Sequence, residues 1–254
     1  MKTPIKMIVT DLDGTLLRSD KTVSDRTKAT LARCREQGIK LAYATGRCAS
    51  ALKLAPSELF DGYATANGAI AMVDNTLIYK RLIPYQDARP LLLACDRRGL
   101  DISSQLGGMD YSNFVMSDVW PEVTNFTLVD FASHETDAEK IISHNLTVED
   151  MDFIESHLPR YAYMVMAIDG LAMITHKEAT KSKAIAALAG YWGITQSEIL
   201  AFGDDLNDID LLEYAGVGVV MDNARDVVKR VGDYICPSND EDGIAAWIEN
   251  NILT

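Results

Sequence analysis

Two aspartates, Asp11 and Asp13, follow an apolar run near the start of the chain, in the segment MIVTDLDGTLL. The run predicts a buried strand that turns at Gly14. Residues two apart on an extended chain point to the same side, so both carboxylates should face one place. Burying such a pair is unfavourable unless it binds a cation, and carboxylate oxygens suit Mg²⁺. One carboxylate could then attack an electrophile while the other moves a proton.

A second apolar run, IKLAYATGR over residues 39–47, ends in Thr45, Gly46 and Arg47. Gly46 would let backbone N–H groups approach an anion closely, and residues 48–55 are predicted to form the helix that follows. This signal is weak by itself, because threonine at the end of a strand is often an ordinary helix cap.

Two later segments carry the remaining charged candidates. Lys181 and Lys183 stand near the start of a predicted helix in EATKSKAIAAL, where a lysine is normally a solvated surface charge. The segment ILAFGDDLNDIDLL predicts a strand that runs into a cluster of acids. Acids gathered at one strand end repel each other unless a cation compensates them. The polar residues of this cluster are Asp204, Asp205, Asn207 and Asp208.

These four segments, in this order, resemble the signature motifs of the haloacid dehalogenase (HAD) superfamily of phosphatases. The lysine segment and the Asn67-Gly68-Ala69 turn are similar to the Cof-like branch (subclass IIB). The resemblance implies that Asp11 attacks phosphorus and that Asp13 is the general acid and base. It also implies that Mg²⁺ is held by Asp11, by Asp204 and by Asp13 through its backbone carbonyl.

The resemblance implies roles for the other residues as well. Asp208 would support the metal site without contacting the metal. Register favours Lys181 over Lys183, because Ala184-Ile185 match the Ala-Leu of the family pattern. Asp205 occupies a variable position and receives no role, and Asp210 is interpreted as a helix surface residue. The residues expected to bind the phosphate or the substrate are Thr45, Gly46, Arg47, Lys181 and Asn207.

Strands and helices alternate over most of the chain, which indicates an α/β fold with a doubly wound, Rossmann-like parallel sheet. All four motifs fall at strand ends or at helix starts that face them, where such sheets place their sites. Predicted helices cover residues 24–38, 181–192, 207–214, 223–231 and 242–253, and a hairpin is predicted to turn at Asp74-Asn75. The core should comprise residues 1–83 and 179–254.

The middle segment, 84–178, has a different pattern and predicts a smaller inserted α+β domain, which the resemblance identifies as a type-2 cap. A cap would close over the site, exclude water and hold the rest of the substrate. Its strands are predicted at 100–108, 138–145, 161–168 and 170–176, and its helices at 86–98 and 147–158. The candidate lining residues are Asp110, Tyr111 and the run 161–166.

The composition excludes several classes of function. The net charge of the 254-residue chain is −13, which argues against a general affinity for nucleic acid or for an anionic membrane. Four scattered cysteines suit a reducing cytoplasm and argue against a zinc site. No apolar stretch reaches the ~18 residues of a membrane span. We therefore expect a cytoplasmic protein whose partner is a small phosphorylated molecule.

The leading interpretation is an Mg²⁺-dependent phosphomonoesterase that hydrolyses small soluble phosphate esters, sugar phosphates above all, through an aspartyl-phosphate. One alternative is a phosphotransferase or mutase of the same superfamily, in which a sugar hydroxyl replaces water as the acceptor. A second is a phospho-aspartate receiver, a signalling module. The large insert and Asp13 argue against a receiver, because a stored phosphoryl group is not served by an acid that hastens its hydrolysis.

Overall fold

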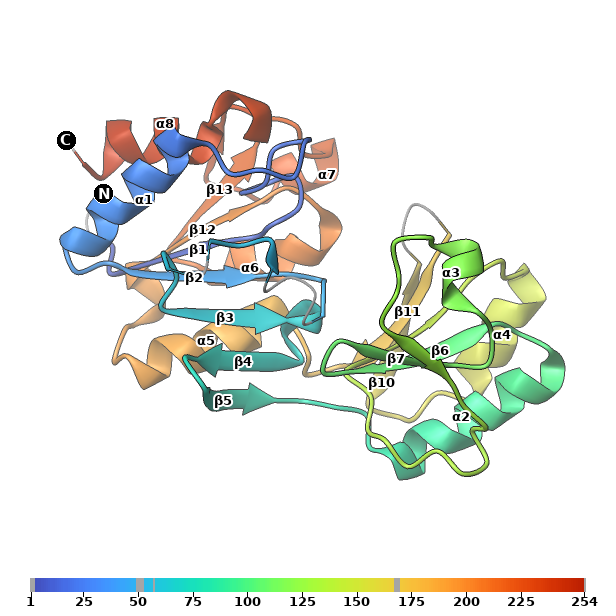
Figure 1. Ribbon diagram of the computed structural model, residues 1–254. Coiled ribbons are helices and arrows are strands. Elements are labelled where there is room, and N and C mark those ends of the chain that lie inside the picture. The colour runs from blue at the N-terminus through green and yellow to red at the C-terminus, as the bar shows by residue number, and fades with distance from the viewer. Residues whose placement is uncertain (1–2, 49–52, 57, 167–169, 254) are drawn as a thin grey trace. The chain divides into compact units, whose positions relative to one another are not determined.

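The computed structural model describes residues 3–48, 53–56, 58–166 and 170–253 (Figure 1). The chain forms two compact units, one of residues Met1–Lys80 and Thr180–Thr254 and the other of residues Arg81–Ala179. All four cysteines are buried, and none of them forms a disulfide. No helix in the described ranges is both long and apolar enough to cross a lipid bilayer.

The first unit is built on an eight-stranded sheet in the order β14-β13-β12-β1-β2-β3-β4-β5. The strands from β14 to β3 run parallel, and β4 and β5 are added as an antiparallel hairpin. The predicted turn at Asp74-Asn75 joins these two strands. The strand bounds are β1 Met7–Thr10, β2 Lys40–Ala44, β3 Gly62–Thr65, β4 Ile70–Val73, β5 Thr76–Lys80, β12 Ile199–Gly203, β13 Val217–Met221 and β14 Tyr234–Cys236.

Alternate residues of the central parallel strands β13, β12, β1 and β2 enter two different apolar cores. In β1, Ile8 packs in the core that holds α1 and α8, whereas Met7 and Val9 pack in the core that holds α5, α6 and α7. Helices on both faces of a parallel sheet define the predicted doubly wound α/β fold, which is confirmed. The helices are α1 Asp25–Glu36, α5 Lys181–Tyr191, α6 Ile209–Tyr214, α7 Asp226–Lys229 and α8 Gly243–Asn251.

Some predicted helix bounds were too long. The helix predicted over 207–214 starts with a 3-10 turn, Leu206–Asp208, before α6, and the helix predicted over 223–231 is the single turn α7. Half of the helix predicted over 48–55, residues 49–52, lies outside the described residues. Ser24 is the N-cap of α1, because its side chain accepts from the backbone N–H of Thr27.

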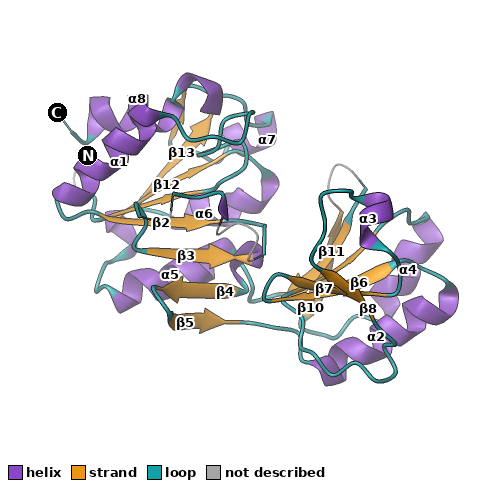
Figure 2. Cartoon of the chain, viewed as in Figure 1, coloured by secondary structure: helices purple, strands orange, loops and turns teal. Residues whose placement is uncertain are grey.

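The second unit has a six-stranded sheet in the order β10-β11-β9-β6-β7-β8, antiparallel except for the β7–β8 pair (Figure 2). One sheet face packs Ile102, Ile141 and Ile174 against the helices α2 and α4. The short elements β7, α3 and β8 were not predicted. The bounds are α2 Tyr85–Arg98, β6 Ile102–Leu106, β7 Met109–Ser112, α3 Met116–Val119, β8 Phe126–Leu128, β9 Lys140–Ser143, α4 Val148–Ser156, β10 Ala162–Met166 and β11 Ala172–His176.

Candidate active site

The candidate site lies where the strand order of the first unit changes direction. Strand β1 has β2 on one side and β12 on the other, and all three run parallel. Their carboxyl ends lead into Asp11, Thr45 and Asp204. This switch point is where doubly wound sheets bind ligands, because the helices that follow the neighbouring strands diverge to opposite faces.

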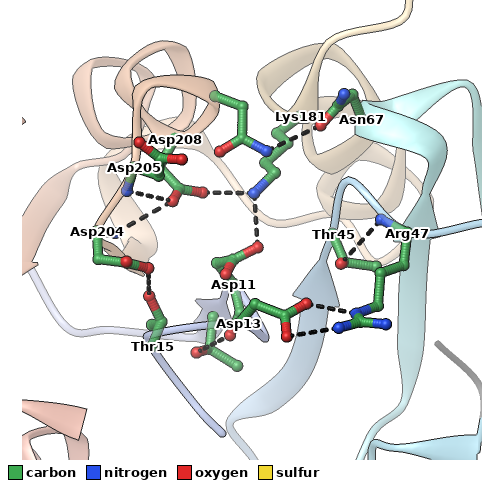
Figure 3. A network of polar contacts seen from close by, with 12 residues as sticks. Asp11, Asp13, Thr15, Thr45, Arg47, Asn67, Lys181, Asp204, Asp205 and Asp208 are labelled. Carbon is green, nitrogen blue, oxygen red and sulfur yellow. Dashed lines mark hydrogen bonds and ion pairs between the residues drawn. The ribbon is translucent and has the colours of Figure 1, made fainter. Parts of the chain in front are cut away.

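Lys181 is the buried cation of the site. Its Nζ donates to Oδ1 of Asp11 at 2.7 Å and to Oδ1 of Asp208 at 2.6 Å, and the residue is only 1% exposed (Figure 3). It is the first residue of α5, which Thr180 caps by accepting from the backbone N–H of Lys183. Burial acts to lower the pKa of Lys181, but the two carboxylates raise it, so this lysine stays charged.

Asp208 holds other parts of the site in place. It is fully buried, and its Oδ2 accepts from the backbone N–H groups of Asp204 and Asp205, both at 3.1 Å. Its Oδ1 accepts from Lys181. Both oxygens of Asp208 are therefore occupied by the loop after β12 and by the lysine.

Asp204 lies beside the turn that follows Asp13. Its Oδ1 accepts from Oγ1 of Thr15 at 2.5 Å. Gly14 adopts a φ of +81°, and a Cβ atom there would lie 2.3 Å from Oδ2 of Asp204, so the carboxylate fits only against a glycine. Burial raises the pKa of Asp204 to about 6, although the hydrogen bond from Thr15 opposes the shift. Thr15 was not singled out from the sequence, but it belongs to the same D-x-D-G-T segment.

The acidic residues form a set that fits a divalent cation. Ligand atoms of Asp11, Asp204 and Asp208 all lie within 4.8 Å of one another. Three carboxylates beside the single ammonium of Lys181 leave two negative charges uncompensated when all are ionised. Burial accordingly raises the pKa of Asp11 to about 8, against the opposing charge of Lys181. A divalent ion would supply the missing charge. In Asp11 and in Asp204, Oδ1 accepts the hydrogen bond from Lys181 or Thr15, which leaves Oδ2 to coordinate such an ion.

The Asp13 side chain turns away from this cluster, as Figure 3 shows. Its Oδ2 accepts from Nε of Arg47 at 2.5 Å, and its Oδ1 accepts from Nη2 of Arg47 at 2.9 Å and from Nζ of Lys21 at 2.9 Å. Burial acts to raise the pKa of Asp13, but these hydrogen bonds lower it to about 2. Arg47, predicted to bind the substrate, is thus paired with the predicted acid–base residue. Lys21 was not recognised from the sequence as part of the site.

The loop after β2 lies against Asn207. Thr45 is buried, and its Oγ1 accepts from the backbone N–H of Arg47 at 3.2 Å. A Cβ atom on Gly46 would lie 3.0 Å from Oδ1 of Asn67 and 3.2 Å from Nδ2 of Asn207. Nδ2 of Asn207 donates to Oδ1 of Asn67 at 3.0 Å. The structure therefore brings together Gly46 and Asn207, two of the residues predicted to bind phosphate, and it places Asn67 beside them.

Three charged residues next to the motifs, Lys183, Asp205 and Asp210, were not expected to take part in the site. Lys183 is exposed, and Asp205 is half-exposed and lies 3.8 Å from Arg225. Asp210, interpreted as a helix surface residue, is half-buried on α6 and accepts from the backbone N–H of Ser182 at 3.0 Å. It thus satisfies an unpaired donor in the first turn of α5, the helix that carries Lys181.

The residues predicted to line the cap do not share one face. Asp110 is buried and accepts from Ser103 and Gln105 at 3.1 and 2.6 Å. Tyr111, the next residue of β7, points to the other face, where its ring lies 4.7 Å from that of His134. The run 161–166 is divided in the same way, since Ala162 and Met164 pack in the apolar core of the second unit.

The first unit is thus a doubly wound α/β domain that gathers acids and a buried lysine at its switch point, where such domains bind their ligands. The chain matches the haloacid dehalogenase-like hydrolases over residues 8–248, and it belongs to that family. A 5-amino-6-(5-phospho-D-ribitylamino)uracil phosphatase of Bacillus subtilis (strain 168) is 28% identical, and the match covers 98% of each chain.

Solved structures agree with this assignment. A HAD-superfamily phosphatase from Bacteroides thetaiotaomicron has a TM-score of 0.85 at 27% identity, covering 97% of this chain and 95% of that one. A subclass IIB sugar phosphatase has a TM-score of 0.81 at 27% identity, covering 96% of this chain and 98% of that one. The predicted membership of the HAD phosphatases, in the Cof-like branch, is confirmed.

Proposed function

We propose that this protein is an Mg²⁺-dependent phosphomonoesterase that hydrolyses small phosphate esters, sugar phosphates foremost, through an aspartyl-phosphate on Asp11. The observation that carries the proposal is the position of Asp11 at the end of β1, buried, with Oδ1 held by Nζ of Lys181 at 2.7 Å. A nucleophile must be fixed in direction, and this ion pair fixes the carboxylate at the ligand-binding edge of the sheet.

The reaction has two displacements at phosphorus. In the first, the Asp11 carboxylate attacks phosphorus, the ester P–O bond breaks, and Asp13 gives a proton to the leaving alkoxide. In the second, water attacks the phosphorus of the aspartyl-phosphate and gives a proton to Asp13. The bond between phosphorus and the Asp11 oxygen breaks, which releases inorganic phosphate and regenerates the Asp11 carboxylate. Asp11, Asp204 and the Asp13 backbone carbonyl would hold Mg²⁺, which would supply positive charge to neutralise the phosphoryl oxygens.

The remaining residues orient the phosphoryl group. Lys181 provides a fixed positive charge beside Asp11, and Thr45 and Asn207 provide hydrogen-bond donors from two other strand ends. Gly46 allows the backbone of the same loop to approach closely. Charge that is already in place before the transition state forms is the usual way in which such sites accelerate phosphoryl transfer.

Arg47 connects substrate binding to the protonation state of Asp13. In the ion pair with Arg47 and Lys21, Asp13 is a carboxylate, the form that takes a proton from water. We propose that the phosphate dianion draws Arg47 away from Asp13. Losing Arg47, the strongest of the groups that lower the pKa of Asp13, would raise that pKa and let Asp13 carry the proton needed by the leaving group.

The substrate class is supported by relatives rather than by a bound ligand. One relative is named for a phosphorylated ribityl compound, and one structural neighbour is described as a sugar phosphatase. One name refers to a phosphorylated ribityl group and the other to sugar phosphates. The net charge of −13 is consistent with a small anionic substrate that is attracted only locally, by Lys181, Arg47 and a bound cation.

The test is the release of inorganic phosphate from a panel of phosphorylated metabolites with Mg²⁺, for the parent protein and for Asp11→Asn. We expect Asp11→Asn to abolish turnover and to leave the fold intact, because the amide is nearly isosteric but cannot attack. Asp205→Asn is the matched control: it removes the same charge nearby from a residue outside the proposed machinery, and it should stay active. Steady-state activity of Asp11→Asn within about tenfold of the parent would reject Asp11 as the nucleophile.

A further inference from the structure

The turn after β3, Ala66–Gly68, adopts an unfavourable backbone conformation. Ala66 has a φ of +50° and Asn67 a φ of +55°. Two consecutive residues with side chains in the left-handed region destabilise the local structure by about 1–2 kcal/mol each, less for asparagine. Such strain persists only where the surrounding contacts impose it, and it is concentrated at functional sites.

Backbone contacts of this turn reach two of the site loops. The N–H of Ala66 donates to the carbonyl of Arg47 at 2.7 Å, and the N–H of Asn67 donates to the carbonyl of Thr45 at 2.9 Å. A Cβ atom on Gly68 would lie 2.1 Å from the carbonyl oxygen of Thr180, the residue before Lys181. The turn is therefore in contact with the loop after β2 and with the start of α5.

The Asn67 side chain reaches a third loop. Its Oδ1 accepts from Nδ2 of Asn207, 140 positions later in the chain, at 3.0 Å. Asn207 is exposed and lies in a short 3-10 turn, so packing alone does not hold its amide in one orientation. The hydrogen bond uses one of the two N–H groups of Nδ2, and it sets the direction of the other.

We propose that Asn67 is a positioning residue that orients the amide of Asn207 toward the phosphoryl group; this inference rests on the proposed phosphatase function. Asparagine suits position 67 for two reasons that act together. It tolerates the left-handed backbone that places the turn against Thr45 and Arg47, and it carries an acceptor at the end of a short side chain. A fixed Asn207 loses less conformational freedom when phosphate binds.

The experiment is a double-mutant cycle of Asn67→Gly and Asn207→Ala. Glycine retains the left-handed backbone and removes the acceptor, so the turn should still form. We expect Asn67→Gly to lower kcat/KM about tenfold, and to weaken the binding of inorganic phosphate to the Mg²⁺-loaded protein by a similar factor in calorimetry. In the Asn207→Ala background, Asn67→Gly should cause no further loss, because its effect passes through Asn207.

Asp74→Gly is the control, since Asp74 has a φ of +50° in the β4–β5 turn and takes no part in the site. It should leave phosphate binding unchanged. Equal losses from Asn67→Gly in both backgrounds would overturn the inference, because the asparagine would then act independently of Asn207. Parent-like phosphate binding by Asn67→Gly would overturn it as well. Phosphate binding is measured without turnover. If the parent protein hydrolysed no ester, the proposed function would be rejected, but the effect of Asn67→Gly on phosphate binding would still test the role of Asn67.

Discussion

Replacing Lys181 by methionine tests the electrostatic account of the site most directly. The side chain is buried, and its ammonium is the group that faces both Asp11 and Asp208, at 2.7 and 2.6 Å. Methionine has a similar length and fills the same space, so the substitution removes charge with little change in packing. Two buried carboxylates lose their shared cation.

The expected effect on stability is large. Removing one partner of a buried ion pair typically destabilises a protein by about 3–5 kcal/mol, because the other charge stays buried and uncompensated. For a chain of this size the same loss corresponds to a decrease of roughly 6–20 °C in melting temperature. Activity should also be lost, since the carboxylate of Asp11 would no longer be held in direction.

The loss of stability should depend on pH in a defined direction. The pKa of Asp11 is already raised to about 8 beside Lys181, above its value in the unfolded chain, and losing the lysine raises it further. A group whose pKa is higher in the folded state stabilises the fold while it is protonated, and that contribution disappears as pH rises through the folded pKa. The difference in stability between Lys181→Met and the parent should therefore be smaller at pH 6 than at pH 9.

Urea unfolding of both metal-free proteins at the two pH values measures this difference. Lys183→Met is the matched control, because Lys183 lies on the same helix but is exposed. Adding Asp11→Asn to Lys181→Met should restore part of the lost stability, since it removes one of the two orphaned charges. A parent-like stability of Lys181→Met, or a loss that is the same at pH 6 and pH 9, would refute the reasoning.

Three further predictions follow from the site. Asp13→Asn should slow hydrolysis by the ~10²–10⁴-fold typical of the loss of a general acid–base group. In rapid-quench kinetics with p-nitrophenyl phosphate, hydrolysis of the aspartyl-phosphate should slow more than its formation. Equal slowing of both steps would indicate a structural role for Asp13. EDTA should abolish activity and Mg²⁺ should restore it, and Asp204→Ala should need far more metal. The affinity for Mg²⁺, measured by calorimetry, should weaken as pH falls from 8 to 6. The reason is that the pKa values of Asp11 and Asp204 are about 8 and about 6, so protons compete with the ion for these carboxylates. Replacing residues 86–175 by a Gly/Ser linker should leave slow, unselective hydrolysis of activated phosphates in a folded core; an unchanged ranking of sugar phosphates would place specificity in the core.

The local sequence was enough to locate the parts of the site. Apolar runs that end in Asp11, Thr45 and Asp204 predicted three strands, and all three strands formed with those residues at their carboxyl ends. Alternation of strands and helices predicted the doubly wound sheet. These features are recoverable because burial on both faces of a parallel sheet requires continuous apolar strands, which are visible in the residues themselves.

Short elements of the second unit were not recoverable in the same way. Strands β7 and β8 have four and three residues, so the apolar–polar alternation in MDYS and FTL is too short to identify a strand. Their strand conformation depends on hydrogen bonds to neighbours, β7 to β6 and β8 to β7. Segments this short form strands through pairing partners rather than through their own propensity.

The partners of the charged groups were decided by the tertiary structure alone. Lys181 bonds to Asp11 across 170 positions of sequence, and Asn207 bonds to Asn67 across 140. Asp13, which the sequence places beside Asp11 on one strand end, instead pairs with Arg47 and Lys21. The sequence by itself determined which residue types stand at each strand end and that their charges need a cation. Which carboxylate meets the lysine, which meets the arginine and which remains for a metal depends on strand order and loop conformation, because hydrogen bonds act over about 3 Å and no local pattern encodes which distant segments approach that closely.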